Sequence, residues 1–156
     1  MLRRYQPKTP DEITELHEFG WRIESALQPI LEDHLGETLV KTERRYDAID
    51  FLGERYQVEL KARRSRDKSG RLVKHDSYSE WLLPASKVNA AAKSPLRTTI
   101  FYYFEGDETL WQIWTDEIDW SKVTCKTPFF HTDRHYYVPK DLWKKVDGDY
   151  GFDWNE

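Results

Sequence analysis

The strongest constraint on the fold is a strict alternation of apolar and polar residues from Arg55 to Ala62. The apolar positions are Tyr56, Val58, Leu60 and Ala62, and the polar positions between them are Gln57, Glu59 and Lys61. Successive side chains of a β-strand point to opposite faces of its sheet. The alternation therefore predicts a strand with one face packed on a core and an acidic and basic opposite face.

A second strand is predicted from Tyr46 to Leu52, joined to the first by a turn at Gly53-Glu54. If this strand folds back through a loop of two or four residues, Phe51 opposes Tyr56 and Asp50 opposes Gln57. Asp50 then shares a face with Glu59 and Lys61. A loop of three residues would exchange the places of Asp50 and Asp47, and the sequence alone leaves that alternative open.

An amphipathic helix is predicted before this hairpin, from Asp11 to about His34. Its apolar residues are Ile13, Leu16, Phe19, Ile23, Leu27, Ile30 and Leu31. Thr9-Pro10 provides a start signal and Gly36 a stop signal. Pro29 lies inside the helix, where a proline removes a hydrogen bond and can kink the axis.

The other predicted elements surround this helix and hairpin. They are a strand at Thr38 to Thr42, an extended piece at Trp81 to Leu83, a short helix from Ser86 through Ala91, a hairpin of Thr98 to Glu105 and Thr109 to Thr115, a strand at Tyr136 to Val138, and a helix at Lys140 to Val146. This order predicts an α/β fold with a mixed central sheet flanked by helices.

The size of the chain, 156 residues, predicts a single domain with a core at about 11–115 and a C-terminal extension at 116–156. One cysteine, Cys125, and no charged-then-apolar leader favour a reducing, cytoplasmic location, and no apolar run is long enough for a membrane span. The formal charge is −4, but Lys41 to Lys74 carries eleven basic and six acidic residues. A phosphate-binding face is therefore expected in the middle of the chain.

Two carboxylates beside an ammonium group suit a hard divalent cation that holds a phosphodiester oxygen and polarises water. Asp50 and Glu59 are the predicted ligands of Mg²⁺, for which Mn²⁺ should substitute. Lys61 is the predicted partner of the attacking water or of the charge that develops on phosphorus.

Asp50, Glu59, Leu60 and Lys61 together resemble the D…(D/E)xK motif of the PD-(D/E)xK nuclease superfamily, with Ile49 in place of the usual proline. The resemblance covers about Asp11 to Glu105. It implies a restriction-endonuclease-like core, metal-dependent cleavage of DNA, and the Leu60 carbonyl as a further metal ligand. The first helix of the family often contributes a glutamate, a role that Glu24, or else Glu18, would fill.

Small viral and phage nucleases of the superfamily show E-L-K-x-R, then a tyrosine, then S-K. Here Glu59 to Arg63, Tyr78 and Ser86-Lys87 are similar to that pattern. The likeness suggests a phage-like endonuclease that would act in the host-cell cytoplasm. Arg63, Arg64, Lys87 and Tyr78 are the expected DNA-binding residues.

The sequence leaves a second interpretation open, in which the same fold is a non-catalytic nucleic-acid-binding or assembly module. A homodimer or higher oligomer is also expected, because one site of a small nuclease attacks one strand of a duplex. Trp111, Trp114, Trp120 and Trp143 favour a core role over base stacking, since aromatic residues in an alternating hairpin usually pack inside.

Overall fold

The computed structural model describes residues 10–42, 49–129 and 131–152, and for residues 12–18 it describes the backbone alone. The two helices in this part are α1 (Pro10–Leu35) and α2 (Ala85–Ala91). The strands are β1 (Val40–Lys41), β2 (Phe51–Leu52), β3 (Tyr56–Arg63), β4 (Glu80–Pro84), β5 (Arg97–Phe104), β6 (Thr109–Trp114), β7 (Thr124–Lys126), β8 (His135–Pro139) and β9 (Lys144–Val146). Short 3₁₀ turns lie at η1 (Thr115–Glu117), η2 (Trp120–Lys122) and η3 (Lys140–Leu142).

The strands form two sheets, and the larger one is mixed. Its order is β1-β2-β3-β5-β6-β9, in which β3 and β5 run parallel and the other neighbours run antiparallel. The smaller sheet has the order β4-β8-β7 and is antiparallel. The expected α/β fold with a mixed sheet and flanking helices is therefore confirmed.

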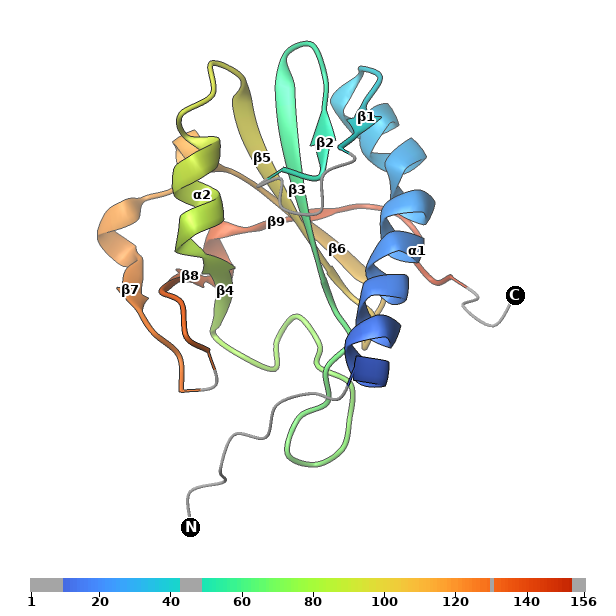
Figure 1. The fold of residues 1–156 in the computed structure, drawn as a ribbon, viewed down its shortest axis with the longest axis vertical. Helices are drawn as coiled ribbons and strands as arrows, with labels where there is room; N and C mark the ends of the chain where they lie inside the picture. The colour runs from blue at the N-terminus through green and yellow to red at the C-terminus, as the bar shows by residue number, and fades with distance from the viewer. Residues whose placement is uncertain (1–9, 43–48, 130, 153–156) are drawn as a thin grey trace.

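Helix α1 covers one face of the larger sheet (Figure 1). Its apolar stripe buries Phe19, Ile23, Leu27 and Leu31 against residues of β2, β3 and β5. Pro29 is exposed and the helix is continuous through it, ending before Gly36 at φ 72°. The left-handed conformation of Gly36 is the expected helix stop.

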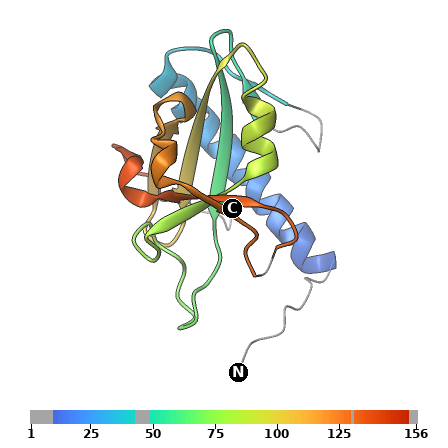
Figure 2. The same cartoon turned by 90° about the vertical axis from the view of Figure 1, so that its left-hand side faces the viewer.

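The opposite face of the larger sheet is covered by α2 and the smaller sheet (Figure 2). A second core forms there, in which the Trp81 ring contacts Tyr102, Phe104, Trp111 and Trp143 at centroid distances of 4.7 to 5.6 Å. The alternation of β3 separates the two cores. Val58 and Leu60 belong to the α1 side, whereas Gln57 and Glu59 lie on the α2 side and are buried.

The register of the β2–β3 hairpin differs from the predicted one by two residues. Phe51 pairs with Val58 and Leu52 with Gln57, so the prediction that Phe51 opposes Tyr56 is wrong. The Gly53 N–H donates to the Tyr56 carbonyl at 2.8 Å, so the two-residue turn is Glu54-Arg55, one residue later than predicted. A shift by two keeps the parity of the pairing, and Asp50, directly before β2, remains next to β3.

The predicted helix from Lys140 to Val146 is also wrong. The chain makes only the η3 turn there, and β9 then pairs with β6 through Leu110 and Val146. Residues 116–152 contribute to both cores, because Val146 and Tyr150 pack on the α1 side and Val138 and Trp143 on the α2 side. The Tyr103 hydroxyl donates to the Tyr150 carbonyl at 2.6 Å.

The chain between β3 and β4 protrudes from one end of the molecule in both views (Figures 1 and 2). It folds on itself through a bridge between Arg66 and Leu72 and a turn in which Asp67 accepts the N–H groups of Ser69 and Arg71. Among the described residues, no helix is both long and apolar enough to cross a membrane.

Candidate metal and nucleic-acid site

Asp50 lies where β2 begins to pair with β3. Its N–H donates to the Val58 carbonyl at 3.0 Å, and its Oδ2 accepts the Leu60 N–H at 2.7 Å. The N–H and C=O of one strand residue point to the same side, so the Leu60 carbonyl is directed toward Asp50, past the paired part of β2. The carboxylate is thus fixed beside a backbone carbonyl.

Glu59 is the most deeply buried acidic group of the site, with 8% of its surface exposed. Its Oε1 lies 3.4 Å from Lys87 Nζ, and its Oε2 has no hydrogen-bond partner among the described residues. Burial, with the nearby Asp50 charge second, raises the pKa of Glu59 to about 8. The long Lys87 contact only partly offsets burial, so this carboxyl holds a proton at neutral pH.

Lys61 follows on the same face of β3 and is half-buried. Burial lowers its pKa, and the charge of Glu59 acts in the opposite direction. Lys61 forms no ion pair with any residue in the described ranges. An ammonium group held here without a fixed partner can donate to an incoming anion.

Glu24 reaches the site from α1 at the edge of the sheet. Its Oε2 lies 2.9 Å from Lys41 Nζ of β1, and burial together with the Asp50 charge raises its pKa. Lys41 is a site residue that the sequence did not predict, because no pattern in a two-residue strand marks its partner. The side chain of Glu18, the alternative to Glu24, and all of Asp47, the alternative to Asp50, lie outside the described residues.

Lys87 projects from α2 toward Glu59. A hollow of about 10 Å³ lies between them and is lined in part by Glu59, Lys61, Lys87 and Val88. This volume is about that of one water-sized probe, so it admits an ion or a water but no larger ligand. A phosphate group must therefore approach from outside it.

The other three predicted DNA-binding residues are placed differently from one another. Arg63 shares the odd-numbered face of β3 with Glu59 and Lys61, and its Nε is buried without a partner among the described residues. Arg64 points to the α1 side, where its Nε lies 3.1 Å from Glu105 and its guanidinium covers the Phe19 ring at 4.6 Å. Tyr78 is exposed in the loop before β4 and does not line the hollow. The structure therefore separates Arg64 and Tyr78 from Glu24, Asp50 and Glu59, which we call the acidic centre.

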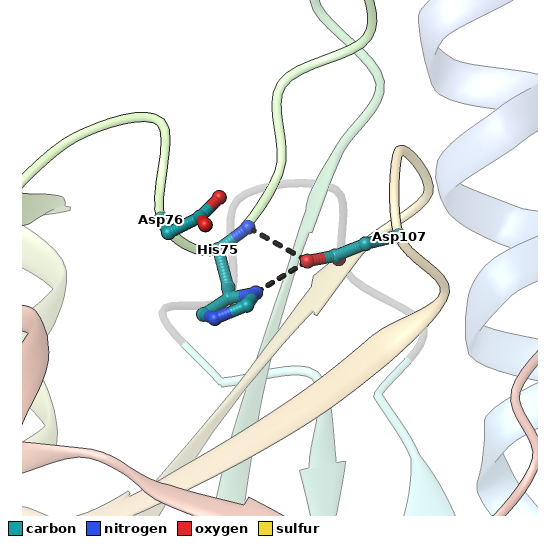
Figure 3. Close-up of side chains that lie close together, drawn as sticks. All are labelled: His75, Asp76 and Asp107. Atoms are coloured by element: carbon teal, nitrogen blue, oxygen red, sulfur yellow. Dashed lines mark hydrogen bonds and ion pairs between the residues drawn. The ribbon is translucent and has the colours of Figure 1, made fainter.

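The three carboxylates are neighbours but do not converge on one point. In the described part of the chain, the group of three possible metal ligands with atoms within 4.8 Å of one another is His75, Asp76 and Asp107, not Glu24, Asp50 and Glu59. Figure 3 shows that His75 and Asp107 already contact each other through the imidazole and the backbone N–H, whereas Asp76 is exposed. Thr109 donates to the other Asp107 oxygen at 2.8 Å, so hydrogen bonds account for the positions of His75 and Asp107.

Two of the three carboxylates of the acidic centre are contacted by ammonium groups. Lys41 contacts Glu24 and Lys87 contacts Glu59, so an ammonium group occupies the place of a cation at two of the three carboxylates. The donors are all oxygen atoms, which is the set that a hard cation such as Mg²⁺ prefers. One of these oxygens, the buried Oε2 of Glu59, has no partner in the described structure.

Comparisons with protein-family models, with curated proteins and with solved structures found no match to this chain.

Proposed function

We propose that the protein is a Mg²⁺-dependent nuclease that hydrolyses phosphodiester bonds in DNA. The observation that carries the proposal is the buried Glu59 carboxyl, whose Oε2 has no partner among the described residues and which lies near Asp50 and on the same face of β3 as Lys61. A buried carboxyl oxygen without a hydrogen-bond partner costs free energy, and such costs are typical of sites that bind a ligand.

The order of elements supports the proposal. A helix, three antiparallel strands, a second helix and a strand parallel to the third follow one another as α1, β1, β2, β3, α2 and β5, with β4 inserted before α2. This order resembles the restriction-endonuclease-like core of the PD-(D/E)xK superfamily. Asp50 directly precedes β2, and Glu59-Leu60-Lys61 lies in β3, which supports the likeness to the family motif.

The residues that would hold the cation are Asp50, Glu59, the Leu60 carbonyl and Glu24. A bound Mg²⁺, or Mn²⁺ in its place, would supply a Lewis acid for a phosphoryl oxygen and lower the pKa of a bound water. Asp50 is oriented for this role by the Leu60 N–H. Glu24 and Glu59 would exchange their contacts with Lys41 and Lys87 for the cation.

The lysines have the complementary role. Lys61, half-buried and unpaired within the described ranges, donates to the attacking water or to the charged phosphoryl oxygens. Lys87, once released from Glu59, faces the same phosphate from α2. Arg63 extends this basic face toward the loop that follows β3.

The test is cleavage of supercoiled plasmid and of single-stranded and branched DNA, with Mg²⁺, Mn²⁺ or a chelator. Glu59→Gln and Lys61→Ala should each lower the cleavage rate by about 100-fold or more, because each removes a group that acts on the reacting phosphate. Glu54→Gln and Lys93→Ala, exposed residues outside the centre, are the matched controls and should cleave at the native rate.

Metal-dependent cleavage that persists in both variants would show that another site or a contaminant is responsible. A folded native protein that binds DNA but cleaves none of these substrates would favour the non-catalytic binding module. The observation in favour of this second candidate is that Glu24, Asp50 and Glu59 are not a group whose ligand atoms all lie within 4.8 Å of one another.

A further inference from the structure

A hollow of about 460 Å³ lies on the other side of α2 from Glu59. We call it the Trp120 pocket, after the indole of η2 that forms part of its wall. Its volume is within the range of small-molecule sites, about 300 to 1,000 Å³. The acidic centre and this pocket share walls, because Val88, Ala91 and Thr98 line both hollows.

The pocket offers an aromatic surface that is held in place and still accessible. Trp120 is 41% exposed, and its ring meets the Tyr136 ring in an edge contact at 5.0 Å. The Tyr136 hydroxyl donates to Asn89 Oδ1 at 2.8 Å, which ties this pair to α2. The sequence had favoured a core role for Trp120, and the structure places this ring at the surface instead.

The polar groups of the pocket suit a neutral ligand better than an anion. Arg97 is its cation, but two of its nitrogens bind Asp116 at 2.7 and 3.0 Å. The Asn89 amide NH₂ donates to no described residue, since only its oxygen is used by Tyr136. A planar group with hydrogen-bonding edges, such as a nucleobase, matches an indole face beside an amide donor.

We propose that the Trp120 pocket receives a nucleobase from a single-stranded segment of DNA, and that the same strand places a phosphate at Glu59 and Lys61 on the other side of α2. The identification of the ligand as DNA rests on the proposed nuclease function. The preferred substrate then carries unpaired nucleotides. A base inside a duplex is stacked and paired, and its extrusion costs a few kcal/mol.

The test measures binding without cleavage, in the presence of a chelator. Single-stranded oligonucleotides that carry 2-aminopurine report stacking by fluorescence quenching, and a blunt duplex of the same sequence serves for comparison. Trp120→Ala should weaken single-strand binding by about 5-fold to 100-fold, the effect of removing one base stack, and should abolish most of the quenching. Binding of the blunt duplex should stay within about 2-fold of native.

Two further variants keep the result interpretable. Trp21→Ala removes an exposed tryptophan from α1, away from the pocket, and should leave both affinities unchanged. Asn89→Asp keeps an oxygen acceptor for Tyr136 but replaces the NH₂ donor, so it should weaken single-strand binding. This variant tests the pocket independently if Trp120→Ala lowers the melting temperature.

Equal loss of single-strand and duplex binding in Trp120→Ala, or no loss in either pocket variant, would overturn the inference. Its failure is distinguishable from failure of the proposed function. Cleavage that depends on Glu59 but not on Trp120 would refute the pocket alone. Quenching that depends on Trp120 in a protein that cleaves nothing would refute the nuclease alone.

Discussion

Glu59 illustrates how one residue links the fold to the proposed chemistry. Alternation along β3 carries this carboxyl into the interface between the sheet and α2, and the ammonium of Lys87 reaches it only at 3.4 Å. The raised pKa of Glu59 makes the free energy of unfolding depend on pH, because the folded protein binds a proton that the unfolded chain has released.

The metal-free protein should therefore lose stability as the pH rises from about 5 to about 8. Within that window an unfolded Glu59, with its ordinary pKa of 4.5, is ionised, whereas the folded carboxyl retains its proton up to about 8. The folded state binds more protons, so its free energy of unfolding falls with pH, by a few kcal/mol at most. Thermal melts in a chelator across this pH range measure the effect.

The matched variant is Glu59→Gln, which keeps the size of the side chain but cannot ionise. Its melting temperature should depend much less on pH over the same window, with contributions of the same sign left from Glu24 and Glu105, whose pKa values are also raised. Mg²⁺ should restore the stability of the native protein at pH 8 and leave the variant unchanged. Parallel pH profiles for the two proteins would contradict the assignment.

Much of this centre could be predicted from the sequence at the residue level. Strand alternation is enough to place Glu59 and Lys61 on one face, but the choice between Asp50 and Asp47 depends on the length of the turn, which the sequence left open. Lys41 could not be predicted, because its contact with Glu24 joins α1 to an edge strand of two residues. Arg64 was assigned to DNA by proximity in sequence, but the same alternation turns it away from Arg63.

Helix α2 depends on tertiary contacts for its position. It has seven residues and no side-chain cap, and so short a helix is not stable in isolation. Gln57, 3% exposed, donates to the Ala91 carbonyl and to the Thr98 hydroxyl, both at 2.7 Å. This side chain ties the end of α2 to β3 and β5, between the acidic centre and the Trp120 pocket.

Gln57→Ala should lower the free energy of unfolding by about 1 to 3 kcal/mol, because the two buried hydrogen bonds of its amide, to the Ala91 carbonyl and the Thr98 hydroxyl, would be lost. For a chain of this size the melting temperature should fall by about 2 to 12 °C. Calorimetry or circular dichroism gives the measurement, with Ser86→Ala, an exposed change on the same helix, as the control. An unchanged melting temperature would mean that water replaces the amide without cost.

Prediction at the scale of elements succeeded where local pattern and tertiary role agree. The β5–β6 hairpin and α2 have the predicted positions. In the β9 segment, the spacing of Leu142, Trp143 and Val146 is typical of a helix, but pairing with the open edge of β6 decides its structure. β-Propensity depends on such neighbours, which the local sequence does not contain.

At the scale of the whole molecule, charge is concentrated on the protruding loop between β3 and β4. Lys68 and Arg71 are exposed there, and Arg66 donates to the Gly70 carbonyl at 2.8 Å within the same turn. The loop continues directly from β3 and therefore from Lys61 and Arg63. A positive arm beside the proposed reacting phosphate is suited to the DNA backbone on either side of it.

Replacing Lys68 and Arg71 with serine should weaken DNA binding most at low salt. Each phosphate that the variant no longer neutralises should reduce the slope of log K against log salt by about 0.7 to 0.9, so up to about 2 for the pair. Replacing Lys144 and Lys145, exposed on β9, is the control with the same change in net charge. Identical slopes for both double variants would show that net charge, not the loop, governs binding.

The position of β9 has a consequence for biosynthesis. The core on the α1 side contains Leu110, Val146 and Tyr150. The buried Tyr103 belongs to the same core, and its hydroxyl donates to the Tyr150 carbonyl. A nascent chain that has not yet emerged from the ribosome through residue 150 leaves those surfaces exposed to water. Folding of this sheet is therefore completed only after residue 150 has left the ribosome, and until then the exposed edge of β6 is a surface that chaperones or other nascent chains can bind.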